Sequence, residues 1–247
     1  MFLGFMTGGV IMTLIVLPLI RIAPLGKERR QLAFLASIRA VFATFMWVAP
    51  RLRLVSEFKV IGLEALKDKG PFLYIANHPS LIDVVALMSL TPRCNCLVKK
   101  ELFHHPWFGG VLRGVGFIPN DSGPILIEAV KQGLEKGHSL VIFPEGTRSP
   151  QEGGLQPFNR GAANIAVRTG ARIAPVLIRL NPRTLMKGQK WYEIPEKVVY
   201  IELRFLDPMT VPAEIENITE APLKVRALNR HLETFFEEQL AALPEIR

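Results

Sequence analysis

The sequence contains few cysteines and no pattern of metal-binding side chains. Two of its 247 residues are cysteines, Cys94 and Cys96, which stand two apart in one short segment. A zinc site would need further cysteine or histidine partners at fixed spacing, and the adjacent His104 and His105 do not provide it. We therefore expect two reduced thiols in or beside a strand, a reducing cytoplasmic compartment and no bound metal.

Signatures of nucleic-acid binding are also missing. The net charge of +8 and the pI of about 9.7 suit nucleic acid, an anionic lipid or an anionic substrate. The basic residues are scattered along the chain, and no zinc-finger, RRM or helix-turn-helix pattern accompanies them. We expect no nucleic-acid partner, which leaves the basic charge to a lipid surface or to an anionic substrate.

Charged side chains are absent from residues 1–20. A helix of that length, at about 1.5 Å per residue, just crosses the hydrocarbon core of a bilayer. A basic cluster follows at residues 21–30, whereas a secretory signal carries its basic cluster before the apolar run, so the positive-inside rule keeps this cluster in the cytoplasm. Residues 32–50 are also apolar but include Arg39, which costs roughly 3 kcal/mol at the bilayer centre, so this stretch is expected in the interface.

These features predict a two-helix membrane anchor over residues 1–50, monotopic or with a single span. Its expected place is the cytoplasmic face of the inner (cell) membrane, with membrane lipid as a partner. Two buried helices of a soluble core are the alternative interpretation.

Residues 51–247 are expected to form one further domain. Short β-like runs alternate there with helical stretches, which predicts an α/β fold with a mixed, largely parallel sheet flanked by helices. The last β-like run alternates apolar with polar residues, as in a half-solvated strand, with Glu202 among the polar ones. The expected strands cover residues 54–61, 72–76, 94–98, 115–118, 139–143, 172–178 and 198–206, and the expected helices cover residues 81–90, 125–136, 161–168 and 223–241. Residues 180–196 and 207–222 are expected to be surface connections.

The segment Asn77–Asp83 carries the strongest chemical signal, because it places His78 and Asp83 five residues apart after an apolar run. Pro79 suits the first turn of a helix, so we expect His78 at the turn and Asp83 one helical turn later, facing back. The carboxylate then accepts the N–H of one imidazole nitrogen while the other nitrogen takes a proton.

A protein nucleophile to go with this pair is missing, since no Gly-x-Ser-x-Gly elbow occurs in the sequence. The pair is therefore expected to act as a general base on a hydroxyl that the substrate supplies. Ser80 is the alternative nucleophile, although a hydroxyl at a helix start is more often a cap.

A second motif, Phe143–Ser149, also follows an apolar run. Gly146 permits a tight turn with exposed N–H groups that could hold an oxyanion, and Arg148 offers a fork for phosphate or carboxylate. A plain loop with a helix-start charge pattern is the alternative.

Asn77–Asp83 and Phe143–Ser149 resemble the first and third motifs of the glycerolipid acyltransferases. Within that group the chain is most similar to the 1-acyl-sn-glycerol-3-phosphate (lysophosphatidate) acyltransferases. Residues 173–178 resemble their fourth motif, residues 98–102 resemble a segment common among them, and residues 158–162 resemble the basic stretch between the third and fourth motifs.

The resemblance implies a membrane-associated acyltransferase of phospholipid biosynthesis. Its acyl donor would be a thioester co-substrate, acyl-CoA or acyl carrier protein, and its acceptor a lysophospholipid such as 1-acyl-sn-glycerol-3-phosphate, giving phosphatidate. No cofactor and no metal are implied. The implied roles are general base for His78, orientation of that base for Asp83, a site wall for Pro175, and acceptor binding for Glu145, Gly146, Thr147 and Arg148, the last on the acceptor phosphate.

One departure from the family pattern concerns the acceptor. The second motif, residues 114–121, usually ends in a basic residue that contacts the acceptor phosphate, but Asn120 and Asp121 stand there. Either Arg113, Arg160 or a neighbouring lysine compensates, or the acceptor is another lyso-lipid, such as a lyso-aminolipid or a secondary-metabolite lipid. A non-catalytic lipid-phosphate binder and a thioester hydrolase remain alternative functions.

Overall fold

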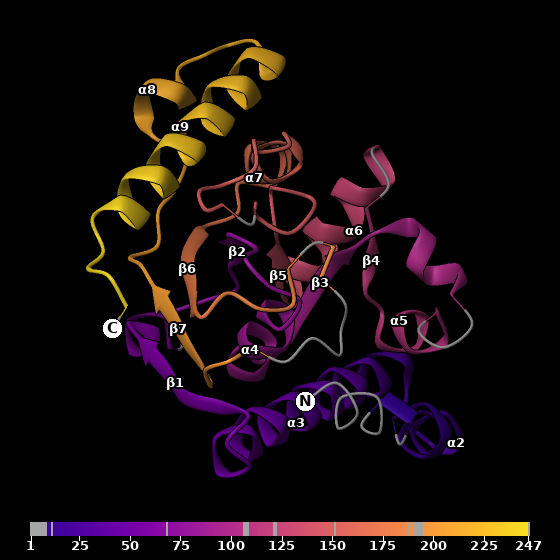
Figure 1. The fold of residues 1–247 in the computed structure, drawn as a ribbon. Coiled ribbons are helices and arrows are strands. Elements are labelled where there is room, and N and C mark those ends of the chain that lie inside the picture. Colours follow the sequence, from indigo (N-terminus) through magenta and orange to yellow (C-terminus); the bar gives the residue numbers. More distant parts are fainter. Residues whose placement is uncertain are drawn as a thin grey trace.

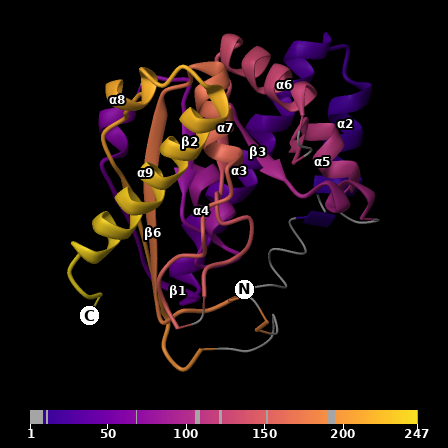
Figure 2. The same ribbon diagram turned by 90° about the horizontal axis from the view of Figure 1, so that it is seen from above.

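A single mixed sheet forms the centre of the protein (Figures 1 and 2). The computed structural model describes residues 9–10, 12–67, 69–105, 109–120, 123–150, 152–186, 188–189 and 195–246. Within them the strands are β1 (Val55–Ile61), β2 (Leu73–Ala76), β3 (Cys94–Val98), β4 (Ile118–Pro119), β5 (Ser139–Ile142), β6 (Ile173–Asn181) and β7 (Val199–Phe205). Their order across the sheet is β1-β7-β6-β2-β5-β3-β4.

Neighbouring strands are parallel except for the antiparallel pair β6–β7. The five strands β4, β3, β5, β2 and β6 therefore end at one common edge of the sheet, the carboxyl edge, where ligands bind in open α/β folds. This arrangement confirms the predicted mixed, largely parallel sheet.

Helices cover both faces of the sheet. They are η1 (Met12–Val16, a π-helix), α2 (Leu17–Ile22), α3 (Lys27–Arg51), α4 (Asp83–Leu90), α5 (Gly109–Val115), α6 (Pro124–Glu135), α7 (Gly161–Thr169), α8 (Ala213–Glu216) and α9 (Ala221–Ala241), with short 3₁₀ turns η2 (Leu63–Leu66) and η3 (Lys100–His104). Helices α3 and α4 pack on one face, and α6, α7 and α9 pack on the other (Figures 1 and 2).

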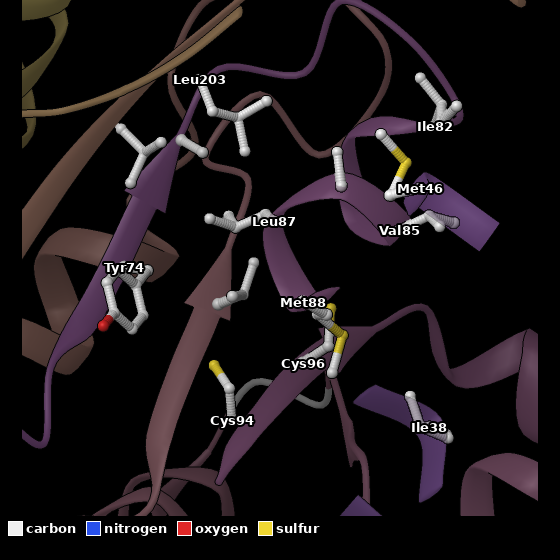
Figure 3. Packing of buried hydrophobic residues seen from close by; sticks show 14 of the residues in the cluster. Ile38, Met46, Tyr74, Ile82, Val85, Leu87, Met88, Cys94, Cys96 and Leu203 are labelled. Atoms are coloured by element: carbon white, nitrogen blue, oxygen red, sulfur yellow. The ribbon is translucent and has the colours of Figure 1, made fainter. Parts of the chain in front are cut away.

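Two apolar clusters, one on each face, make up the core. Strand β2 contributes to both, because Tyr74 and Ala76 belong to one cluster and Leu73 and Ile75 to the other. All four residues are buried, as expected for a central strand of a parallel sheet. In the first cluster, Tyr74 of β2 and the cysteines of β3 gather with side chains of α4 and α3 (Figure 3).

Several sequence-based expectations about the fold need correction. Strand β6 runs on to Asn181 and helix α8 lies within residues 207–222, both in stretches expected to be surface connections. The run expected as a strand at residues 115–118 contributes only β4, because helix α5 extends to Val115 and Gly116 then turns the chain with φ +79°. The polar face of β7 is not solvated throughout, since Glu202 is buried between Arg179 and Arg204 at 3.0 and 3.5 Å. Helix α4 begins at Asp83 itself rather than earlier.

The apolar N-terminal region contains a long helix that packs on the domain. Helix α3 begins at Lys27 and is long and apolar enough to cross a membrane by length and composition, whereas the apolar helical stretch before it, Met12–Ile22, is shorter. Phe34 and Ile38 of α3 share the cluster that also contains Val85 of α4. Residues 1–8 and 11 of the first predicted apolar stretch lie outside the described residues.

Gly62, directly after β1, gives a test of the pairing between β1 and β7. A Cβ there would overlap the carbonyl oxygen of Phe205, and the backbone is left-handed at φ +78°. We expect Gly62→Ala to lower the free energy of unfolding by about 1–2 kcal/mol for the left-handed backbone plus about 1–3 kcal/mol for the overlap. Gly170→Ala, at φ +65° with open space around the Cβ position, should lose only the first part. Urea unfolding of both variants measures the difference, and equal losses would contradict the expectation.

Candidate active site at the carboxyl edge of the sheet

Asn77 determines how the chain leaves β2 at the carboxyl edge. Its side-chain Nδ2 donates to the carbonyl of Ile178 at 2.9 Å, and its Oδ1 accepts the Ile178 N–H at 2.8 Å. The side chain thus takes the place of a peptide group and extends the pairing of β2 with β6. Because Asn77 is buried, these two bonds hold the start of the next turn firmly.

His78 and Asp83 form the predicted pair. The Nδ1 of His78 lies 3.0 Å from Oδ2 of Asp83, and the imidazole side chain retains 16% exposure. An ionised carboxylate can only accept, so we assign the proton to Nδ1, which leaves Nε2 with a free lone pair. The ring also stacks on Phe143, with centroids 4.3 Å apart and planes 29° apart.

Asp83 is fully buried and stands at the first position of α4. Its Oδ2 also accepts the Ser80 N–H at 2.6 Å, so the carboxylate closes the turn from residue 80 to 83 as well as orienting the imidazole. Burial raises the pKa of Asp83 to about 6, although the hydrogen bond and charge of His78 and the bond from Ser80 act in the opposite direction. The expected position one turn into the helix is therefore wrong, while the expected contact is present.

Glu145 lies behind His78 rather than in the open site. Its Oε1 accepts the backbone N–H of His78 at 2.7 Å and the hydroxyl of Ser149 at 2.8 Å. Its Oε2 accepts the N–H of Gln156 at 2.7 Å, and the residue is 3% exposed. The carboxylate is thus occupied by internal donors and joins the two motif segments.

The turn after β5 brings Gly146 and Thr147 to the surface of the site. Gly146 is exposed with φ +65°, and its own N–H donates to the carbonyl of Phe143 at 3.0 Å. That N–H is therefore engaged within the turn, and an oxyanion contact by other N–H groups of the turn stays a prediction. Thr147 is half-buried beside it. Asn159 steadies the turn, since its Nδ2 donates to the carbonyls of Pro144 and Glu145, both at 3.1 Å.

Arg148 reaches a part of the chain that the motifs do not include. Its Nη1 donates to the carbonyls of Leu185 and Met186 at 2.7 and 2.9 Å. Burial lowers the pKa of Arg148, while the nearby charge of Asp83 raises it. Among the described residues, none accepts a hydrogen bond from Nε or Nη2 of Arg148.

The stretch after β6 was expected to be a surface connection, and for residues 182–186 this is wrong. Thr184 and Met186 are buried, because this segment lies against both motifs. Ser80 takes part in the same contact, since its hydroxyl donates to the Thr184 carbonyl at 2.8 Å. Ser80 has no exposed surface and its hydroxyl is engaged, which disfavours the alternative of Ser80 as the nucleophile.

The cysteines and the end of the second motif lie elsewhere. Cys94 and Cys96 are buried free thiols on β3, and burial raises both pKa values, that of Cys96 to about 12. Asn120 is exposed at the carboxyl end of β4, where its N–H donates to Val98 at 2.8 Å. The Arg113 guanidinium is engaged by the carbonyl of Phe103, while Asp121 lies outside the described residues.

The geometry presents an imidazole oriented by a carboxylate, and the hydroxyls of the neighbouring Ser80 and Ser149 donate to the Thr184 carbonyl and to Glu145. The chain belongs to the acyltransferase family, whose profile, described as Acyltransferase, matches residues 57–179, about half of the chain. The profile includes both motif segments.

Similar proteins carry consistent names. A chloroplastic 1-acyl-sn-glycerol-3-phosphate acyltransferase of Brassica napus is 31% identical over 60% of this chain and 45% of its own length. A yeast protein, from Saccharomyces cerevisiae, with the same activity in its name is 33% identical over 69% of this chain and 56% of its length. One from Pseudomonas aeruginosa is 26% identical over 92% of this chain and 84% of its length. The chain thus spans about half the length of several relatives that it matches.

A solved structure shares the fold. The 1-acyl-sn-glycerophosphate acyltransferase PlsC from Thermotoga maritima superposes with a TM-score of 0.65 over 99% of this chain and 96% of its own, at 19% identity. The mixed sheet and its flanking helices therefore occur together in a known protein.

The buried Asp83 carboxylate predicts how Asp83→Asn changes the turnover rate and the pH dependence of stability. The Asn amide would donate to Nδ1 and leave the proton on Nε2, so we expect the turnover rate to fall by about 10³–10⁴-fold. Because burial raises the pKa from its ordinary value to about 6, the native state holds an extra proton between about pH 4 and pH 6. The stability that this proton contributes is present below that window and lost above it.

Asp83→Asn cannot ionise, but its amide N–H₂ would face the Ser80 N–H that Oδ2 accepts in the parent, so some stability is lost at every pH. Relative to the parent, the stability of the variant should be highest above pH 6 and should decline on acidification. Unfolding curves at pH 4.5, 6 and 8 and initial rates at pH 8 check both effects. A variant that is destabilised more at pH 8 than at pH 4.5 would contradict the sign.

Glu145→Gln separates a positioning role from acceptor contact. The amide brings an N–H₂ group against donors from His78 and Ser149, so we expect a loss of about 1–3 kcal/mol in stability and a lower turnover rate. Glu152→Gln, an exposed residue of the same loop, is the control and should match the parent. If Glu145→Gln unfolds like the parent and raises only the KM for the acceptor, the carboxylate contacts the acceptor as the resemblance implies.

Proposed function

We propose that this chain is an O-acyltransferase that moves a fatty acyl group from a thioester to the hydroxyl of a lysophospholipid. The observation that carries the proposal is the orientation of His78, whose Nδ1 faces the Asp83 carboxylate and whose Nε2 has no hydrogen-bond partner among the described residues. Because the hydroxyls of the neighbouring Ser80 and Ser149 are engaged elsewhere, the base is suited to a hydroxyl that arrives with the substrate.

The reaction would proceed by direct transfer. Nε2 of His78 takes the proton of the acceptor hydroxyl as its oxygen attacks the thioester carbonyl, and Asp83 stabilises the imidazolium that forms. The tetrahedral intermediate then expels the thiolate, which receives the proton from His78, and an ester of the acceptor is released. The donor is acyl-CoA or acyl carrier protein, and no metal or cofactor enters these steps.

We propose 1-acyl-sn-glycerol-3-phosphate as the first acceptor to test, because the relatives carry that name. Nε and Nη2 of Arg148 suit its phosphate, and Gly146 and Thr147 would line the space between phosphate and base. Glu145 would serve this site by holding the His78 backbone. Another lyso-lipid is the alternative acceptor, favoured by Asn120 at the place of a basic residue.

The reaction would take place at a membrane surface. Helix α3 is long and apolar enough for a bilayer, and large apolar side chains are exposed around it and on the preceding helices. These are Leu14, Ile15, Leu19, Ile22, Trp47 and Leu52. The cytoplasmic face of the inner membrane is the proposed location, since the basic cluster at residues 21–30 follows the first apolar stretch.

A matrix of donors and acceptors tests the proposal. The purified protein in detergent is given acyl-CoA or acyl carrier protein with lysophosphatidate, other lysophospholipids or a lyso-aminolipid, and products are identified by mass spectrometry. We expect phosphatidate from lysophosphatidate and a loss of at least about 10²–10⁴-fold in rate for His78→Ala. His104→Ala, an exposed histidine on η3, is the control.

The same matrix covers the alternatives. Donor consumed equally with and without acceptor identifies a thioester hydrolase, and lipid binding without donor consumption identifies a binder. A His78→Ala variant as active as the parent rejects the mechanism in every case.

A further inference from the structure

Leu185 joins the two motif segments through a single carbonyl oxygen. This oxygen accepts the Leu81 N–H of the first motif at 3.3 Å and Nη1 of Arg148 from the third motif at 2.7 Å. A carbonyl has two lone pairs, so both are used. Leu185 reaches this position with a left-handed backbone, φ 55°, which is unfavourable for a residue other than glycine. Strain of this kind persists where the surrounding contacts determine it, often at functional sites.

Ser80 strengthens the same junction from the side of the catalytic pair. Its N–H donates to the Asp83 carboxylate at 2.6 Å, and its hydroxyl donates to the Thr184 carbonyl at 2.8 Å. One buried residue therefore contacts both the orienting carboxylate and the segment that holds Arg148. Residues 182–186, called the 182–186 segment below, are therefore linked both to the His78–Asp83 pair and to the Arg148 guanidinium.

We propose that the 182–186 segment is a positioning element of the acceptor site. Through the Leu185 carbonyl it sets the distance between His78, which takes the proton of the hydroxyl, and Arg148, which faces the anionic group of the acceptor. It would thereby select acceptors whose hydroxyl and phosphate are close together, as in a lysophosphatidate. Leu185 acts through its backbone and Ser80 through its hydroxyl; neither touches the substrate. This inference rests on the proposed acyl transfer.

Sequence patterns give no sign of this role, because backbone carbonyls are the acceptors. Nη1 of Arg148 is held by two of them, Leu185 and Met186. A guanidinium fixed at one nitrogen presents its other donors in a defined direction, since the group is planar. If the 182–186 segment were displaced, Arg148 would keep its positive charge, but its Nε and Nη2 donors would point in another direction.

Two pairs of variants test the proposal. Ser80→Ala removes the bond to Thr184, and Ser89→Ala is its matched control, because Ser89 is also buried and donates its hydroxyl to a backbone carbonyl, that of Ala86 on the same helix α4. Leu185→Val cannot adopt the left-handed backbone readily, whereas Leu185→Asn can. The kcat and the KM for lysophosphatidate and for an uncharged monoacylglycerol are measured with acyl-CoA as donor.

We expect Ser80→Ala and Leu185→Val to raise the KM for lysophosphatidate by about 10-fold, as for the loss of one or two hydrogen bonds. The KM for monoacylglycerol should change less than 3-fold, and Ser89→Ala and Leu185→Asn should behave like the parent. A fall in kcat that is equal for both acceptors, or equal effects of Ser80→Ala and Ser89→Ala, overturns the proposal.

Failure of the proposed function is recognised separately. If the parent transfers no acyl group to any acceptor, binding of lysophosphatidate to the parent and to Ser80→Ala is measured by titration calorimetry in detergent micelles. About 10-fold weaker binding by the variant supports the 182–186 segment as a positioning element even then. Equal binding, or no binding by the parent, overturns it.

Discussion

A carboxylate without contact to solvent is the constraint on which the site depends. An ionised group in the protein interior is stable only where donors and opposite charge compensate for its lost hydration. Asp83 receives an N–H from Ser80, faces Nδ1 of His78 and lies within the field of Arg148. Its second oxygen, Oδ1, is buried without a hydrogen-bond partner among the described residues, so the compensation is incomplete. This explains why the pKa stays raised and why the carboxylate is strongly disposed to stabilise a charged imidazolium.

Two buried carboxylates act on different parts of the same histidine. Asp83 holds the ring at Nδ1, and Glu145 accepts the backbone N–H of the same residue. The negative charge of Glu145 also contributes to the raised pKa of Asp83. A base must keep both its position and its tautomer. Glu145 holds the position of the His78 backbone, and Asp83 determines that the proton stays on Nδ1. Phe143 limits the remaining rotation of the ring by stacking on it.

Sequence patterns predicted the parts of the fold that depend on local residue order. Apolar runs predicted strands β2, β3 and β5, and helical periodicity predicted α6, α7 and α9. Burial on one or both faces of an element produces these patterns of apolar residues. The contact of His78 with Asp83 was also predictable, since both residues belong to one short segment. The predicted start of α4 is too early. Pro79 is compatible with a helix start, but residues 80–83 form a turn that the Asp83 carboxylate closes, and the helix begins only at Asp83.

The role of the 182–186 segment could not be predicted in the same way. Its contacts use carbonyl groups that every residue has, and they join positions about a hundred residues apart, such as Ser80 and Thr184. The hydrogen bonds that Glu145 accepts within the protein could not be predicted for the same reason, since two of its three donors are backbone N–H groups. Pairings of this kind depend on the assembled sheet, in which β2, β5 and β6 end side by side.

The same assembly connects the proposed membrane surface with the base. Helix α3 packs along α4, and Met46 near its end lies beside Ile82 and Val85 at the beginning of α4 (Figure 3). Asp83 is the first residue of α4, so it stands between these two contacts in the sequence. The helix that we propose to rest against lipid therefore also supports the turn that orients His78. Protein interiors are closely packed and transmit displacement, so the depth of α3 in a lipid surface and the position of the base would be set together rather than through a flexible tether.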